Sequence, residues 1–242
     1  MTAIEREHWR QAAHAMAMPF DAALGVHGQD AHFLEHAVWD FAGTPVENYP
    51  LLLHYHPLTI YRHQVLKQAD AVLAQFNRPD LFSAEQKRVD FDYYDRLTTG
   101  DSTLSASGQS IMAAEVGRME LAESYFRKAL ATDLDNAHSN TADGVHVASA
   151  GSIWSCLTMG FGGLRDWNGW HLDPRLPAGW RRLRFQLMIE GVLVGVDISH
   201  EAIRLALIGG DDSVVSLKVR GTGGDAQRSG AESLDTLCER HT

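Results

Sequence analysis

The chain has 242 residues, 45% of them hydrophobic, and a formal net charge of −10, so it can bury a sizeable core as one large or two modest domains. The negative charge, with no basic run longer than Arg181-Arg182, argues against nucleic-acid and membrane partners. Two distant cysteines, Cys156 and Cys238, and a charged N-terminus without a secretion signal predict a cytoplasmic protein without disulfides.

The N-terminal part of the chain has helical spacing with one long interruption. Residues 2–18 are predicted to form a helix, because the apolar residues fall near one face and Pro19 follows. Residues 19–57 are rich in Gly and Pro and are predicted to form a long irregular connection, a type of segment that is often functional. Helical spacing resumes at Leu58 and is predicted to continue to about Phe76.

Further helices are predicted in the middle of the chain. The segment 83–94 opens with Ser-Ala-Glu-Gln, which has the spacing of a capping box. A helical pair, 105–116 and 119–131, is predicted on either side of Gly117, which suits a left-handed C-cap. A last helix is predicted over 144–160, where a group of glycines ends it.

After residue 180 the apolar residues alternate with a period of two, which is typical of strands. Short strands are predicted over 183–189, 192–198, 203–208 and 214–219. Helices followed by strands favour two domains or an α+β arrangement. The predicted organisation is helical over 1–165, a linker over 166–180, a β region over 181–220 and, because Gly, Asp, Ser and Arg dominate there, a disordered tail over 221–242.

Several segments carry a family resemblance through their order and spacing. They are Val65–Asp70, Asp101–Ser105, Asn140–His146 with the flanking Leu134–Asn136 and Gly151–Trp154, and Gly160–Arg165 followed by Asp173–Pro177. Together they resemble glycoside hydrolase family 65, the group that contains maltose, trehalose and kojibiose phosphorylases. The resemblance spans roughly residues 50–205.

The resemblance implies a fold and a reaction. The fold would be mainly α: the later part of an (α/α)6 barrel, followed by a short antiparallel β-sandwich segment. The activity would be that of an inverting α-glucoside phosphorylase, in which inorganic phosphate attacks a glucose disaccharide and releases β-glucose 1-phosphate without any other cofactor. The alternative within the family is a hydrolase (trehalase-like or kojibiose hydrolase-like), in which a carboxylate activates water.

The resemblance also implies which residues contact sugar. Lys67 and Gln68 match a pair that contacts sugar hydroxyls, and a cationic donor beside an amide suits vicinal hydroxyls. A solvated Lys-Gln pair on a helix is the alternative interpretation. Asp101 stands where several family members carry Glu; it could bind a sugar hydroxyl or act as the base of a hydrolase.

Phosphate-binding roles are implied for residues at two predicted helix starts. His146 matches a family residue at the phosphate site, and backbone N–H groups at a helix start favour an anion. A capped or packed histidine is the alternative. Ser102, Thr103 and Ser105 form a hydroxyl cluster at another helix start. Hydroxyls and backbone amides suit phosphate, but Ser and Thr are also ordinary N-caps, and the two interpretations have equal weight.

One family feature is not found in this sequence. The family's general acid is a Glu in an Asn-Glu-Tyr-like context upstream of the Lys-Gln pair, whereas Glu47-Asn48-Tyr49 has these letters in another order and lies close to Lys67. We therefore expect the chain alone to be inactive. A separate chain with the front of the barrel, or a second copy in a homodimer, is an expected partner.

Two rival interpretations concern binding. Residues 117–134 resemble one tetratricopeptide helix and its turn, which would make the chain a non-catalytic helical interaction module, but such a fold needs about three repeats of 34 residues. His54 and His56 lie on one side of a predicted extended segment, yet no third ligand has a convincing spacing. No metal site is expected.

Overall fold

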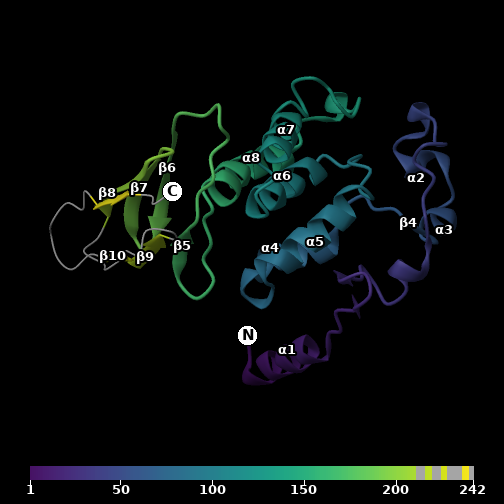
Figure 1. Ribbon diagram of the computed structural model, residues 1–242, viewed down its shortest axis with the longest axis horizontal. Helices are drawn as coiled ribbons and strands as arrows, with labels where there is room; N and C mark the ends of the chain where they lie inside the picture. The colour runs from purple at the N-terminus through teal and green to yellow at the C-terminus, as the bar shows by residue number, and fades with distance from the viewer. Residues whose placement is uncertain (211–215, 220–224, 228–235, 240–242) are drawn as a thin grey trace. The chain divides into compact units, whose positions relative to one another are not determined.

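The chain is described by a computed structural model over residues 1–210, 216–219, 225–227 and 236–239, and it forms two compact units (Figure 1). Unit 1 consists of Met1–Asn77 and Phe82–Thr99; unit 2 consists of Arg78–Leu81 and the described residues from Gly100 onward. Apart from the two-residue strands of unit 1, helices come first along the chain and the larger sheets follow, as expected. Within the described residues, every helix is too short or too polar to cross a bilayer.

Unit 1 consists of helices and two-residue strands joined by turns. Its elements are α1 (Ala3–Ala15), β1 (Phe20–Asp21), β2 (Val26–His27), η1 (Phe33–Glu35), β3 (Ala37–Val38), η2 (Val46–Asn48), α2 (Leu51–His54), α3 (Pro57–Ile60), β4 (His63–Gln64), α4 (Asp70–Asn77) and α5 (Ala84–Asp95). Strands β1 and β2 pair antiparallel, and β3 and β4 pair parallel. The long irregular connection predicted before residue 57 is confirmed, with only short elements inside it.

Helix α1 confirms the first predicted helix. The Glu5 N–H donates to Thr2 Oγ1 over 3.2 Å, and the Thr2 N–H donates to the Glu5 carboxylate over 2.6 Å, which completes a capping box. None of the residues of α1 is buried, and its apolar Ile4 and Trp9 are exposed. The predicted apolar face of α1 is therefore not buried by any other described part of unit 1.

The continuous helix predicted from Leu58 to Phe76 is wrong. Helix α3 ends at Ile60, and an extended segment separates it from α4. The buried Gln64 holds this segment, because its amide donates to the carbonyls of Leu34 (3.3 Å) and His36 (2.7 Å). These bonds, together with the β3–β4 pairing, outweigh the helical spacing of the apolar residues.

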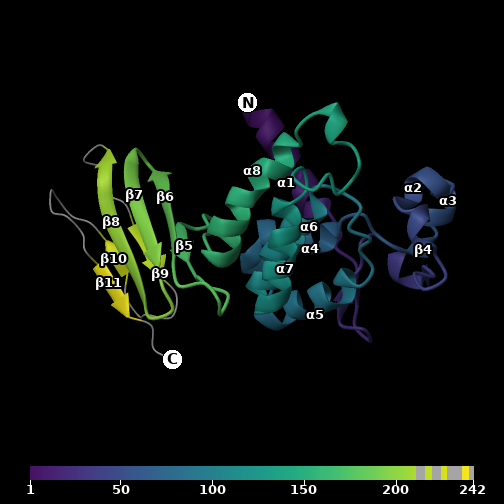
Figure 2. The ribbon, with the colours of Figure 1, turned by 90° about the horizontal axis from the view of Figure 1, so that it is seen from above.

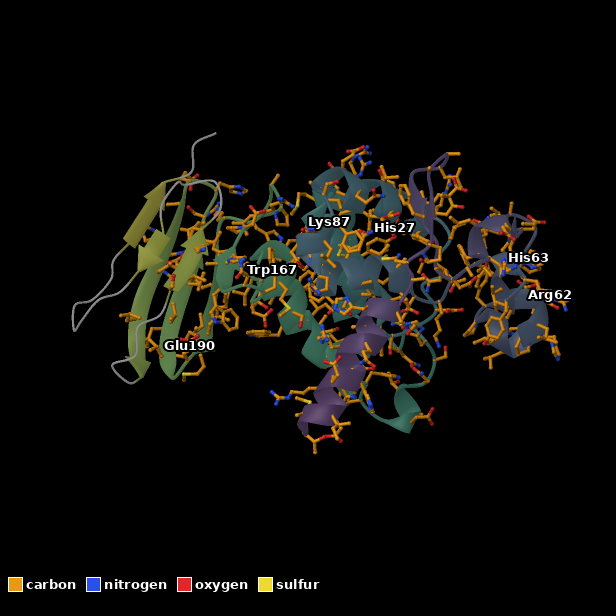
Figure 3. All side chains as sticks on the ribbon, turned by 90° about the horizontal axis from the view of Figure 1, so that it is seen from below. His27, Arg62, His63, Lys87, Trp167 and Glu190 are labelled. Carbon is orange, nitrogen blue, oxygen red and sulfur yellow. The ribbon has the colours of Figure 1, made fainter. Side chains whose placement is uncertain are left out.

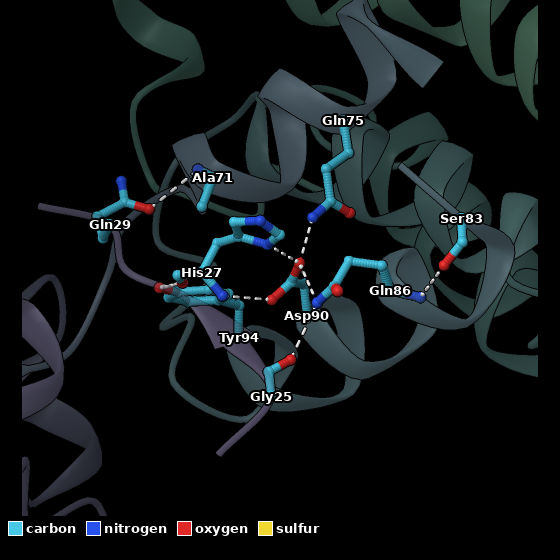
Figure 4. A network of polar contacts seen from close by, with 9 residues as sticks. All are labelled: Gly25, His27, Gln29, Ala71, Gln75, Ser83, Gln86, Asp90 and Tyr94. Atoms are coloured by element: carbon cyan, nitrogen blue, oxygen red, sulfur yellow. Dashed lines mark hydrogen bonds and ion pairs between the residues drawn. The ribbon is translucent and has the colours of Figure 1, made fainter. Parts of the chain in front are cut away.

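A buried polar network joins β2 to α4 and α5 (Figure 4). The fully buried Asp90 accepts hydrogen bonds from the His27 backbone N–H (2.8 Å), from His27 Nδ1 (2.7 Å) and from the Gln75 amide. The Gln86 amide donates to the Gly25 carbonyl over 2.9 Å. A buried carboxylate is tolerated only when such donors replace water, so the network fixes β2 on the two helices.

Unit 2 begins with a helical layer and continues into two sheets (Figure 2). Besides the short η3 (Pro79–Leu81), its helices are α6 (Ser105–Glu115), α7 (Met119–Leu130), η4 (Thr141–Asp143), α8 (Val147–Ser155) and the π-helical η5 (Cys156–Phe161). Its strands are β5 (Trp170–Leu172), β6 (Leu183–Ile189), β7 (Val192–Ile198), β8 (Ala202–Gly210), β9 (Ser216–Val219), β10 (Asp225–Gln227) and β11 (Thr236–Glu239).

The helical pair α6–α7 is confirmed, including its turn. Gly117 has φ +79°, and the N–H groups of Arg118 and Gly117 donate to the carbonyls of Ala113 (2.7 Å) and Ala114 (3.1 Å). These two bonds form a Schellman motif, in which glycine avoids the strain of the left-handed conformation. Because most side chains of α6 are small, neighbouring elements can pack close to its backbone.

The last predicted helix is confirmed with a later start, because α8 begins at Val147 and runs on through η5 to Phe161. A Cβ on Gly160 would lie 3.4 Å from the Ile111 Cα, so glycine lets η5 approach the backbone of α6 closely. The expected termination by glycines is also confirmed, since η5 ends just before Gly162 and Gly163.

The predicted strands appear as two sheets within the described residues. The 4-stranded sheet has the order β11-β8-β7-β6 and is antiparallel, and the 3-stranded sheet has the order β10-β9-β5, with β5 parallel to β9. Strands β6 and β7 are joined by Glu190-Gly191, both with positive φ, in a tight turn at one end of the sheet (Figure 3). The buried Val192, Val194, Val196 and Ile198 confirm the period of two.

The predicted linker and the predicted tail compare with the structure as follows. The segment 166–180 contains β5 and packs on the helices: the Arg175 guanidinium donates to the carbonyl of Ala114 over 2.9 Å, and the ring centroids of Trp180 and Phe161 are 4.7 Å apart. It therefore belongs to unit 2 with α6–α8. Of the predicted disordered tail 221–242, the described segments are the strands β10 and β11; the rest lies outside the described residues.

Candidate functional site

The predicted sugar-contacting pair lies in unit 1, in the bend between β4 and α4. Lys67 is exposed and Gln68 is half-buried. The preceding residue is held on both sides, because the Leu66 N–H donates to the Leu97 carbonyl (2.9 Å) and the Leu66 carbonyl accepts from the Thr99 N–H (2.8 Å). The pair therefore projects from a fixed backbone, not from a helix face as the sequence suggested.

The start of α4 fixes the other end of this bend. The Ala71 N–H, one of the free donors in the first turn, donates to Gln29 Oε1 over 3.1 Å. Gln29 follows the strand that Asp90 secures, so the buried network and the Lys67-Gln68 bend are parts of one rigid arrangement (Figure 4).

The predicted hydroxyl cluster lies in unit 2, where the loop 101–104 leads into α6. Ser102 caps its own turn: its Oγ accepts from the Leu104 N–H (3.3 Å), and its carbonyl accepts from the Ser105 N–H (3.1 Å). Ser105 is buried, with 4% exposure, whereas Ser102 is half-buried. Of the two, Ser102 is thus the better placed to reach a ligand.

Asp101 has an unsatisfied acceptor. Its Oδ1 is buried and receives no hydrogen bond from the part of the chain that the structure describes. A buried carboxylate oxygen without a donor is costly, so a donor from outside these residues, such as a sugar hydroxyl, would relieve a real deficit.

His146 is the N-cap residue of α8, which confirms the predicted helix start. Its backbone N–H donates to Asp133 Oδ2 over 3.0 Å, and its Nδ1 lies 2.5 Å from Asp133 Oδ1. These hydrogen bonds from His146 hold the pKa of Asp133 below its usual value, so Asp133 is a carboxylate at neutral pH.

Hydroxyl groups tie the His146 helix to the hydroxyl loop. Ser149 Oγ in the first turn of α8 donates to the Thr103 carbonyl over 2.9 Å. One turn further, Ser152 Oγ and Ser107 Oγ are 2.6 Å apart. The helix starts of α6 and α8 are therefore held together, and both predicted phosphate segments belong to one locality of unit 2.

This locality suits anion binding and does not suit nucleophilic or metal chemistry. The first turns of α6 and α8 present backbone N–H groups, which favour an oxyanion together with the helix dipole. Burial raises the pKa of the nearby Cys156 thiol to about 11, which keeps it protonated and unreactive at neutral pH. Among the described residues no cluster of His, Cys, Asp and Glu could hold a metal ion.

Sequence reasoning missed Asp133, Ser149 and the Ser107–Ser152 contact. Asp133 is separated from His146 by an irregular loop, so no helical or strand period links the two. Repeated Ser on the buried faces of α6 and α8 was the one available signal, because buried hydroxyls in helices need partners.

Comparison with known proteins gives a consistent result. Residues 1–155 match the sequence profile described as the glycosyl hydrolase family 65 central catalytic domain, and residues 164–223 match that of the family's C-terminal domain. The chain is 43% identical over 214 residues to an α,α-trehalose phosphorylase of Geobacillus stearothermophilus, covering 88% of this chain and 28% of that protein. It is 31% identical over 221 residues to a kojibiose phosphorylase of Halothermothrix orenii, covering 90% and 28%.

The fold has a counterpart among solved structures. A protein described as a kojibiose phosphorylase from human microbiome matches with a TM-score of 0.82 at 24% identity, over 99% of this chain and 31% of that one. The helical part and the sheets thus have the fold of the corresponding segment there. The chain spans little more than a quarter of the length of these curated relatives, 28% in both cases.

Proposed function

The chain belongs to glycoside hydrolase family 65, and we propose from this that it is the C-terminal part of an inverting α-glucoside phosphorylase. In this proposal its helices form the later part of an (α/α)6 barrel, and its strands begin the β-sandwich that follows. The substrates are a glucose disaccharide with an α-linkage and inorganic phosphate, and the product is β-glucose 1-phosphate. No further cofactor is required.

The relatives' names support an α-glucoside phosphorylase, since they act on trehalose and on kojibiose by those names. The observation that carries the phosphate half of the proposal is the joining of the 101–104 loop to the start of α8 by the Ser149–Thr103 hydrogen bond. This bond places Ser102 and His146, which match family positions, at two helix starts in one locality. Because the chain belongs to this family, the interpretation as a non-catalytic helical interaction module is not retained.

The proposed chemistry is a single displacement. A phosphate oxygen attacks the anomeric carbon on the face opposite the leaving oxygen, and a general acid protonates that oxygen as the bond breaks. Lys67 and Gln68 bind sugar hydroxyls, and Asp101 accepts from another hydroxyl. Ser102 and His146 hold phosphate, and Ser105 contributes to the phosphate site through the turn that its N–H closes with the Ser102 carbonyl.

The hydrolase remains the alternative within the family, and Asp101 is the residue that would serve it. Its buried Oδ1 without a donor could accept a proton from water. In that case phosphate would be neither bound nor consumed. The predicted cytoplasmic location and the predicted partner chain stay predictions.

Titration of the purified chain with inorganic phosphate separates these functions. We expect the backbone amide NMR signals of residues 101–105 and 146–149 to shift, because an anion bound at these two helix starts changes the electrostatic environment of their N–H groups. Chloride at matched ionic strength is the control and should leave them in place. If phosphate shifts no signals, or shifts only signals outside residues 101–105 and 146–149, the result would contradict the phosphorylase and favour the hydrolase.

A further inference from the structure

Asp133 binds His146 at two points of the same residue. One carboxylate oxygen accepts the His146 backbone N–H over 3.0 Å, and the other lies 2.5 Å from ring atom Nδ1. Because the backbone and the ring are held by one rigid carboxylate, the orientation of the imidazole relative to the first turn of α8 is fixed. Asp133 itself follows α7 in a separate stretch of chain.

This contact determines which ring nitrogen is left for a ligand. A carboxylate accepts hydrogen bonds only, so the proton of a neutral His146 ring lies on Nδ1. Nε2 is then the nitrogen directed away from Asp133. When the ring is protonated, Nδ1–H stays on Asp133 and Nε2–H becomes a donor that an oxyanion can accept.

A second histidine shows what the same contact looks like in a core. His27 also donates its backbone N–H and its Nδ1–H to one carboxylate, Asp90. Asp90 is fully buried and also accepts from the Gln75 amide, which is the environment of a structural staple. Asp133 is different: its side chain is 25% exposed, and within the described residues His146 alone hydrogen-bonds to it.

The Asp133 oxygens therefore hold a half-buried histidine at a helix start, not one enclosed in a core. A carboxylate next to the ring also balances the positive charge that the ring carries when it donates to an anion. Loss of that partner would leave the ring free to rotate and to place either nitrogen outward.

We propose that Asp133 is the positioning residue of the phosphate site: it fixes the His146 tautomer and turns Nε2 toward the phosphate oxygen. This inference rests on the proposed function, because it takes phosphate as the ligand of His146. It assigns to Asp133 a role in binding that goes beyond holding the loop before α8.

Asp133→Asn tests the role with little change in shape. One Asn oxygen can still accept the His146 backbone N–H, but the amide NH2 then faces Nδ1, which must accept instead of donate. We expect the neutral ring to change to the Nε2–H tautomer, read from imidazole 15N shifts. The affinity for inorganic phosphate should fall on the order of tenfold, because the variant lacks the carboxylate that orients the ring and balances the positive charge of its doubly protonated form, the form that combines an Nε2–H donor with a charge opposite to that of phosphate. Asp133→Glu retains the carboxylate and should retain the Nδ1–H tautomer.

Asp135→Asn is the matched control, since it removes the same charge from an exposed residue of the same loop. It should change neither the tautomer nor the affinity. If Asp133→Asn binds phosphate as the unmodified chain does and keeps the Nδ1–H tautomer, the inference is wrong while the phosphate site stands. If the unmodified chain binds no phosphate, the phosphate site and the role of Asp133 both fail. A change of tautomer in Asp133→Asn that Asp133→Glu does not show, with weakened phosphate binding, supports the inference.

Discussion

Purified alone, the 242-residue chain is expected to cleave none of trehalose, kojibiose and maltose, with or without inorganic phosphate. The reason is the proton that the leaving sugar oxygen needs. In the proposed reaction a carboxylic acid supplies it, and no Glu of this sequence stands in an Asn-Glu-Tyr-like context upstream of Lys67. Asp101 does not replace it, because its proposed role is to accept a hydrogen bond from a sugar hydroxyl.

The size of the expected effect follows from acid catalysis. A positioned general acid contributes roughly 10²–10⁴-fold to such a reaction, and a sugar alkoxide is a poor leaving group without it. Turnover should therefore fall below detection.

Release of glucose and glucose 1-phosphate, followed by enzymatic assay over a day, measures this directly. Lys67→Ala is the control against a contaminating glycosidase, because contaminant activity would not depend on Lys67. Robust turnover that co-purifies with the chain and disappears in Lys67→Ala would overturn the assignment of the missing acid.

Replacement of the buried carboxylate of unit 1 should give the largest loss of stability. In the unmodified chain, the Asp90 carboxylate accepts from the His27 backbone N–H, His27 Nδ1 and the Gln75 amide. In Asp90→Asn an NH2 group, which is itself a donor, replaces one of the two accepting oxygens. At least one buried donor is left without an acceptor. We expect the free energy of unfolding to fall by about 3 kcal/mol.

Chemical denaturation followed by circular dichroism measures the loss, and hydrogen exchange at residues 25–29 locates it. Asp92→Asn is the matched control on the same helix. Its carboxylate pairs with Arg88 over 3.2 Å and is 34% exposed, so it should cost about 0.5 kcal/mol or less. Equal, small effects of the two substitutions would show that the Asp90 network does not hold unit 1 together.

Local signals in the sequence predicted the elements that depend on local interactions. Gly117 ends α6 because a left-handed turn needs no other part of the chain. Ser83 starts α5 in the same way, since its Oγ accepts the Gln86 N–H over 3.1 Å. The alternation over 183–189 predicted β6 with both ends correct, because one face of that strand is buried.

The errors arise where distant residues decide. Apolar residues between Leu58 and Phe76 have a helical period, but β4 forms there because residues 37–38 and the carbonyls bound by Gln64 lie alongside. Strand β5 was missed because its partner β9 comes far later in the chain.

The same limit applied to the site. The matching segments predicted His146 and its helix start, but not Asp133, which reaches His146 across an irregular loop. Nor did spacing reveal the hydrogen bond from Ser149 to the Thr103 carbonyl, which joins the two phosphate segments. A family pattern points to residues that contact ligands, while the residues that orient them become visible only in three dimensions.

The most direct test of the whole account is the product formed by a complete enzyme that contains this chain. The chain can replace the matching segment of the Geobacillus stearothermophilus trehalose phosphorylase, to which it is 43% identical. The account predicts that the folded chimera consumes an α-linked glucose disaccharide only with inorganic phosphate, and that 31P and 1H NMR show β-glucose 1-phosphate. Glucose release at a rate independent of phosphate, without any glucose 1-phosphate, would contradict it.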